Sequence, residues 1–282
     1  NGNSVQVKDK ADPRENIRDA GEDVREGETV IHGGADLLPA HIGMMAVVGR
    51  STVLVGRRPR IAILSTGDEI MDLDEPVSGP LIYNSNGYML AAQIKSAGGI
   101  PSYLGIAHDT EEDLMEKFKW ALQCDMVVSS GGVSVGDYDL VKASLKKMGQ
   151  EMLFWKVAMK PGKPLAFGRI DDIPVFGLPG NPVSSFVSFE QFVRPSIRKM
   201  MGANRLTHRT VQAKLTRTVH KKEGRQHFLS AYVQWQDGVC TVNPTQEQGS
   251  GILKSTVNAN GLLIFPLELT EMAAGTEVPV QL

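Results

Sequence analysis

Hydroxyls, glycines and carboxylates are concentrated in the stretch SSGGVSVGDYD, Ser129 to Asp139. It follows the apolar run MVV and precedes a predicted helix, so it lies where a buried strand ends. Its glycines can adopt positive φ and let an anion approach the backbone N–H groups, and Ser134 adds a hydroxyl donor. Asp137 and Asp139 repel an anion, but a divalent cation could bridge them to a phosphate. A glycine-rich turn with a helix-capping aspartate is the alternative, and the stretch alone leaves both open.

Three more polar turns follow predicted strands, namely STGDE (65–69), HDT (108–110) and GLPGNPVSS (177–185). In an α/β sheet, ligands gather beyond the carboxyl ends of the strands, so we expect the four turns to lie together. The acids of STGDE and HDT also suit solvated turns and helix starts. GLPGNPVSS opens a long predicted helix, whose free N–H groups suit either a phosphate or an ordinary cap.

Basic residues occur in two further places. KVAMKPGKP holds Lys160 and Lys163 around a Pro-Gly turn, which suggests charges placed for an oxyanion rather than two solvated lysines in a hairpin. Towards the C-terminus, EGRQHF contains Arg225 and QEQGSG contains Ser250, and each alone indicates an ordinary turn. The histidines show no zinc-type spacing, and the sequence contains no Walker A or GxGxxG motif.

The elements around these turns predict the fold. Strands and helices alternate from Arg60 to a long helix that ends near Gly202, which predicts a three-layer α/β/α domain with a largely parallel sheet. LFWKVAM, PLAFGRI and IPVFGLPG follow one another without a helix, so part of the sheet is expected to be antiparallel. After about Asn204, period-two alternation between turns predicts a compact all-β barrel.

The front of the chain is less regular. We expect brief strands and turns there, a short helix after Pro39, and no complete core. The division expected is a partial linker domain at 1–57, an α/β domain at 58–204 and a β-barrel domain at 205–282. The first residues are typical of the tail of a preceding element, so we expect further residues before them.

Composition narrows the function classes. The 282 residues are 41% hydrophobic and 22% charged, with a formal net charge of −2 that gives no electrostatic support for nucleic-acid binding. Two distant cysteines suit a reducing cytoplasm. No apolar run approaches the ~20 residues that cross a bilayer. We therefore predict a cytoplasmic protein without a nucleic-acid or membrane role.

Together the motifs STGDE, SSGGVSVGDYD, KPGKPLAFG and GLPGNPVSS, in this order, resemble the molybdopterin molybdenumtransferase family (molybdenum insertase, MoeA), which is related to the gephyrin E domain. The resemblance runs from NIRDAGEDVREG to the C-terminal β unit. It implies a molybdopterin-binding α/β domain followed by the family's barrel. It also implies synthesis of the molybdenum cofactor, in which molybdate enters adenylated molybdopterin and AMP leaves with the help of Mg²⁺.

The resemblance also implies roles for residues. Asp139 and Glu69 would hold Mg²⁺ in an acidic catalytic pocket that Asp109 and Asp23 of the GED segment complete. By the same resemblance, eight further residues would bind the pterin phosphate, molybdate or adenylate. They are Gly131, Gly132, Ser134, Lys160, Lys163, Ser184, Arg225 and Ser250. Molybdate is a tetrahedral dianion, so cations and hydroxyls can position it, and tungstate would fit equally well.

The resemblance implies a further domain before the GED segment, and we expect that domain to be missing from this sequence. The implied partners are the two substrates, a second copy in a homodimer when full length, and the molybdopterin adenylyltransferase. Two other functions stay open. One is the related adenylyltransferase, although its single domain does not match the linker-like front and the β unit. The other is a non-catalytic pterin-binding or scaffolding module, which the intact acids and bases argue against.

Overall fold

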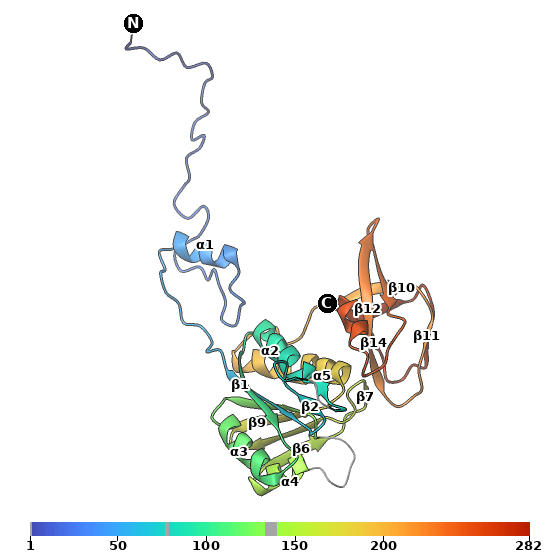
Figure 1. Cartoon of the computed structure of the whole chain (residues 1–282). Helices are drawn as coiled ribbons and strands as arrows, with labels where there is room; N and C mark the ends of the chain where they lie inside the picture. Colours follow the sequence, from blue (N-terminus) through green and yellow to red (C-terminus); the bar gives the residue numbers. More distant parts are fainter. Residues whose placement is uncertain (1, 77–78, 133–139) are drawn as a thin grey trace. The chain divides into compact units, whose positions relative to one another are not determined.

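A computed structural model gives the structure of the chain and describes residues 2–76, 79–132 and 140–282 (Figure 1). The chain divides into two compact units, Asn1–Leu54 and Val55–Leu282. The first unit contains the predicted helix, α1 (Pro39–Val47), and none of its described residues is buried, as expected for a segment without its own core. The brief strands expected before residue 58 are wrong, since none occurs among the described residues 2–57. The apolar pairs there are too short, between turns, to build a ladder.

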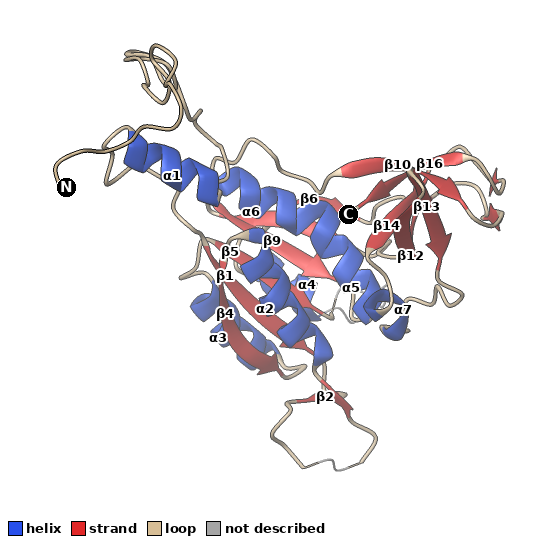
Figure 2. Ribbon diagram, turned by 90° about the horizontal axis from the view of Figure 1, so that it is seen from above, coloured by secondary structure: helices blue, strands red, loops and turns tan. Residues whose placement is uncertain are grey.

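The second unit contains a six-stranded sheet of order β4-β1-β5-β9-β8-β6 (Figure 2). β1 pairs in parallel with β4 and β5, and β5 with β9, whereas β8 runs antiparallel to β9 and β6. The predicted mixture of parallel and antiparallel strands is confirmed. The strands are β1 (Arg60–Thr66), β4 (Ile100–Ala107), β5 (Met126–Ser130), β6 (Glu151–Trp155), β8 (Ala166–Ile170) and β9 (Ile173–Leu178).

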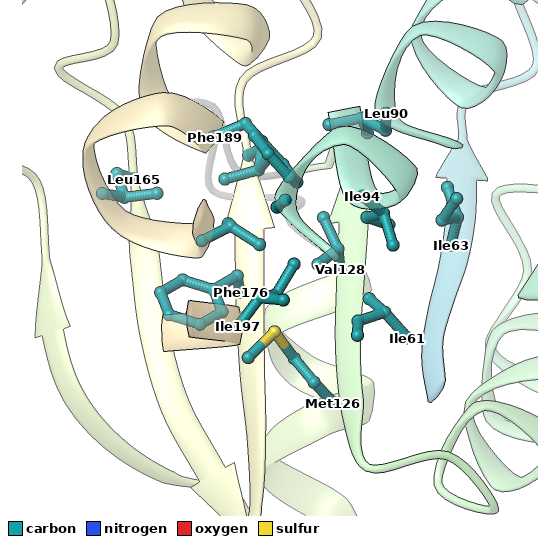
Figure 3. Close-up of a cluster of buried hydrophobic side chains, with 13 residues drawn as sticks. Ile61, Ile63, Leu90, Ile94, Met126, Val128, Leu165, Phe176, Phe189 and Ile197 are labelled. Atoms are coloured by element: carbon teal, nitrogen blue, oxygen red, sulfur yellow. The ribbon is translucent and has the colours of Figure 1, made fainter. Parts of the chain in front are cut away.

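Helices cover both faces of this sheet, because successive side chains of its buried strands point to opposite sides. On one face, Ile61 and Ile63 pack against α2 (Ser85–Ala97) and the long helix that follows β9 (Figure 3). On the other face, Ala62 and Leu64 pack against α3 (Glu111–Ala121) and α4 (Leu140–Lys147). The three-layer α/β/α domain predicted from the sequence is confirmed.

The long helix is not uniform. It consists of α5 (Pro182–Ser188), a π-helical turn η1 (Phe189–Val193) and α6 (Arg194–Met200). Pro195 is the second residue of α6, one residue past the π-helical turn. A proline inside a helix lacks an N–H donor and crowds the carbonyl four residues earlier, and the wider turn relieves that conflict.

The predicted β-barrel is also confirmed. The strands β13-β10-β16-β14-β12 form a ring that closes through a second pairing between β12 and β13. The short strands β11 and β15 pair beside this ring, and α7 lies between β13 and β14. The elements are β10 (Thr210–Leu215), β11 (Val219–His220), β12 (Gln226–Gln236), β13 (Val239–Pro244), α7 (Lys254–Val257), β14 (Gly261–Phe265), β15 (Glu271–Met272) and β16 (Glu277–Gln281).

A two-residue strand joins the barrel to the α/β domain. β7 (Met159–Lys160) comes from the segment between β6 and β8, yet it pairs in parallel with β12, with Lys160 opposite His227. Behind this pair, a shared apolar cluster contains Met159, Val183, Val187, Phe228 and Leu262. Backbone pairing and a common core therefore fix the barrel against the carboxyl end of the sheet. Within the described parts of the chain, no helix is long and apolar enough to cross a membrane.

Candidate active site

A cleft of about 640 Å³ lies where β1, β5 and β9 end. Its lining comes from the end of β1 and the turn after it, the segment 82–86 that leads into α2, the turn after β5, Pro164 before β8 and the turn before α5, with one residue from the barrel. All four polar turns lie at this edge of the sheet, since the Asp109 N–H of HDT donates to Asp68 of STGDE, and three of them line the cleft. The lining includes Ser65, Thr66, Glu69, Asn84, Asn86, Ser130, Gly131, Gly132, Pro164, Gly180, Asn181 and Gly251.

The glycines after β5 are required by the structure. Gly131 and Gly132 have φ of 95° and 65°, which side chains rarely adopt. A Cβ on Gly131 would lie 2.4 Å from the carbonyl oxygen of Thr66, and one on Gly132 would lie 2.2 Å from a methyl carbon of Val141. The missing side chains leave the backbone open to the cleft, as the predicted anion cradle needs.

Two asparagines organise the floor of the cleft, and the sequence reasoning missed both. Asn86 is buried in the first turn of α2, and its Nδ2 donates to Ser130 Oγ (2.8 Å) and to the carbonyl oxygen of Gly180 (2.7 Å). Asn84 caps the same helix by accepting from the Gly87 backbone N–H at 3.0 Å. The amide of Asn86 thus ties the turns after β5 and β9 to α2.

The acids after β1 and β4 form a second group. The backbone N–H of Asp109 donates to Asp68 Oδ1 (3.1 Å), and His108 Nδ1 lies 3.4 Å from the same oxygen. Partial burial, followed by the negative charge of Asp68, raises the pKa of Asp109. Glu69 is exposed and lines the cleft itself. Two of the predicted acids therefore lie near each other, because Asp109 is hydrogen-bonded to Asp68 and Glu69 is the next residue in the chain.

The barrel reaches the cleft at the start of α5. The Val183 backbone N–H donates to the carbonyl oxygen of Ser250 (3.0 Å), and Asn181 Nδ2 lies 3.3 Å from Ser250 Oγ. The predicted helix start thus gives one of its free N–H groups to the barrel. Ser184, in the same turn, is only 4% exposed and is not among the cleft-lining residues.

Cations gather where β7 meets β12. Lys160 is exposed opposite His227, and Arg225 directly precedes β12. Burial of the His227 imidazole, followed by the charges of Lys160, Lys221 and Arg225, lowers the pKa of His227 to about 4. Predicted residues from the α/β domain and from the barrel therefore meet beside one neutral histidine.

The remaining predicted residues lie elsewhere. Lys163 is exposed, one residue before the cleft-lining Pro164, and its carbonyl oxygen accepts from the Val157 N–H at 3.0 Å. Asp23 belongs to the first unit. Ser134, Asp137 and Asp139 lie outside the described residues.

Comparison with known proteins decides the family. Over 98% of its length the chain is 37% identical to "Molybdopterin molybdenumtransferase 2" of Mycobacterium tuberculosis, and it covers 69% of that protein. The chain belongs to the molybdopterin molybdenumtransferase family. It is also 36% identical to the molybdopterin molybdenumtransferase of Haemophilus influenzae, with 95% of the chain and 67% of that protein covered.

Three family models divide this chain in the same order. Residues 1–49 match "MoeA N-terminal region (domain I and II)", residues 62–199 match "Probable molybdopterin binding domain", and residues 212–282 match "MoeA C-terminal region (domain IV)". Gly131, Gly132, Gly180 and the asparagines of the cleft fall within the molybdopterin-binding match, whereas Arg225, Ser250 and Gly251 fall within the C-terminal one.

Solved structures agree with the family assignment. A MoeA protein from Pyrococcus horikoshii superimposes with a TM-score of 0.81 at 30% identity, over 93% of this chain and 64% of that one. A molybdenum cofactor biosynthesis protein from Pyrococcus furiosus gives a TM-score of 0.73 at 26% identity, over 93% and 82%. This chain thus spans about two thirds of the length of several of these relatives.

Proposed function

We propose that this member of the molybdopterin molybdenumtransferase family is an enzyme of molybdenum cofactor synthesis that inserts molybdate into adenylated molybdopterin and releases AMP. The observation that carries the proposal is the cleft at the carboxyl ends of β1, β5 and β9, with its open glycine backbone and its contribution from the barrel. The two relatives compared above are named molybdopterin molybdenumtransferases and support the same activity.

In this proposal, different residues around the cleft bind different parts of the substrates. The backbone at Gly131 and Gly132, together with Ser134, receives a phosphate of the substrate, and Asn86 holds the neighbouring turns in position. Lys160, Lys163, Arg225, Ser184 and Ser250 are the donors proposed for molybdate or phosphate. Guanidinium and ammonium groups bind tetrahedral dianions through charge-assisted hydrogen bonds. Because His227 stays neutral beside Lys160 and Arg225, it adds no charge to an anion's surroundings.

Magnesium is part of the proposal, with Glu69 and Asp139 as its ligands. Glu69 fits this role because its exposed carboxylate lines the cleft. The described residues contain no cluster of three or more His, Cys, Asp or Glu that could hold a metal. Mg²⁺ keeps several waters and often uses only one or two carboxylates, so such a cluster is not required. The ion would offset charge on the phosphoanhydride, while Asp109 and Asp23 would complete the acidic surroundings.

The test is an assay of AMP release. Full-length protein is incubated with adenylated molybdopterin, Mg²⁺ and molybdate, and we expect AMP to appear only when molybdate is present. ATP-dependent adenylation of free molybdopterin would instead assign the adenylyltransferase activity. Pterin binding without either reaction would assign a scaffolding role. The homodimer and a contact with the adenylyltransferase are proposed as well, and light scattering of the full-length protein, alone and with that enzyme, tests them.

A further inference from the structure

Two isoleucines give the cleft an aliphatic wall. β2 (Ile70–Met71) and β3 (Ile82–Tyr83) pair in parallel, with Ile70 opposite Ile82 and Met71 opposite Tyr83. Side chains opposite one another on neighbouring strands project to the same face, so the two isoleucines share a face. Both line the cleft, and Ile82 is 61% exposed, whereas Met71 is 2% exposed. Tyr83, opposite Met71, is 46% exposed and lines the cleft as well. The strand pair therefore buries Met71 and presents the two isoleucines to the cleft beside Tyr83.

This strand pair is held in place on the α/β domain. The backbone N–H of Ile82 donates to the carbonyl oxygen of Glu69 at 2.9 Å. Directly after β2, the Asp72 carboxylate accepts hydrogen bonds from the hydroxyls of Tyr88 and Tyr103, the latter at 3.1 Å. Tyr88 of α2 and Tyr103 of β4 thus fix the position of the aliphatic wall, which makes it a formed surface before any ligand arrives.

The rest of the cleft has a different chemistry. Its floor carries the open backbone of Gly131 and Gly132 and the polar side chains of Ser65, Asn84 and Asn86. Such a floor suits a phosphate and the hydrogen-bonding edge of a ring, whereas an aliphatic surface suits the face of a ring. A single ligand that satisfies both walls carries a phosphate and a planar heterocycle.

We propose that the shared face of Ile70 and Ile82 is the platform on which the planar nitrogen heterocycle of a phosphate-bearing substrate lies. The inference rests on the proposed function, which supplies a substrate of this class. Adenylated molybdopterin has two such rings, a pterin and an adenine, and both present a flat face with polar edges. The platform would orient the ring while the glycine backbone holds the phosphate.

The test measures binding of AMP, neopterin phosphate and ribose 5-phosphate by isothermal titration calorimetry. The first two carry an adenine and a pterin ring, and the third carries no ring. We expect Ile82→Asn to weaken binding of at least one ring phosphate about tenfold, or ~1.4 kcal/mol, and to leave ribose 5-phosphate unchanged. Ile82→Val should retain most of the affinity. The ring phosphate that loses affinity identifies the occupant.

A matched control is available at the opposite end of the strands. Ile100 is 44% exposed at the first residue of β4, so Ile100→Asn removes a similar surface far from the cleft and should change no affinity. Equal ring affinities in wild type and Ile82→Asn would overturn the platform, and so would an equal loss for the ringless phosphate. AMP release is measured on the same preparations. Ring affinity that depends on Ile82 without molybdate-dependent AMP release would retain the platform and reject the proposed function.

Discussion

Asn86 is the side chain through which three segments of the cleft hold together, so Asn86→Ala is the most informative perturbation. Its Nδ2 makes hydrogen bonds of 2.8 Å and 2.7 Å to partners 44 and 94 residues away. A hydrogen bond between neutral groups contributes about 1 kcal/mol net, and a buried group left without a partner costs about 1–3 kcal/mol. Gly180 is exposed and its carbonyl can bind water, whereas Ser130 is only 3% exposed. We therefore expect Asn86→Ala to lower the free energy of unfolding by about 2–4 kcal/mol.

Urea denaturation of the whole chain measures this effect. The midpoint should fall while the m value stays constant, because the surface exposed on unfolding is unchanged. Asn258→Ala is the control, since Asn258 lies exposed beyond the last turn of α7 and its replacement should cost less than about 0.5 kcal/mol. Asn86→Ala within 0.5 kcal/mol of wild type would refute the idea that this amide holds the turns together. If the fold survives, ring-phosphate affinity should fall as well, because the turns after β5 and β9 are released.

Three further predictions concern the cleft and its cationic border. Gly131→Ala should lower the free energy of unfolding by at least about 2 kcal/mol, because the new Cβ would collide with the Thr66 carbonyl oxygen. Gly275→Ala is the control: its φ is 84° but its surroundings are open, so it should lose only the about 1–2 kcal/mol that the left-handed backbone conformation costs a residue with a side chain. Equal losses in thermal denaturation would contradict the close contact. Because the folded pKa of His227 is about 4, below its unfolded value, the stability that its neutral form confers is present above pH 6.5 and lost on acidification towards pH 4. His227→Gln should reduce that loss by about 1–3 kcal/mol, and identical pH profiles of the urea midpoint would argue against it. Asp139→Asn should abolish molybdate-dependent AMP release while circular dichroism stays unchanged, and wild-type turnover would remove Asp139 from the mechanism.

Much of the fold could be predicted because its signals are local. Runs such as RIAILST and DMVVSS bury both faces, and the Gly-Gly pair after α2 and the acidic start of α3 mark helix boundaries within a few residues. The antiparallel part of the sheet followed from the lack of a helix between consecutive strands. The brief strands expected before residue 58 failed because a short apolar pair carries no information about a pairing partner.

The site was only partly predictable for the opposite reason. Glycines and acids clustered at strand ends can be recognised from the sequence as candidate site residues. Asn84 and Asn86 in YNSNGY, by contrast, look like ordinary helix-start residues. Their significance comes from partners brought near by the fold. Likewise, nothing in QEQGSG reveals that the carbonyl of Ser250 occupies the N–H of Val183. Such contacts between distant segments leave no periodic pattern to read.

The short strand β7 fixes the length of the loop that carries it. Met159 is buried in the cluster shared with the barrel, and the next residue, Lys160, is exposed. Neighbouring residues of a strand point to opposite faces, so a slip of one residue against β12 exchanges their places. The lysine charge would then enter an apolar cluster, and a methionine would stand among the cations. An insertion or deletion of a single residue directly beside β7 would therefore disrupt the packing of Met159 between the two domains and bury the charge of Lys160. We expect the loop next to β7 to tolerate changes in length less well than an ordinary surface loop.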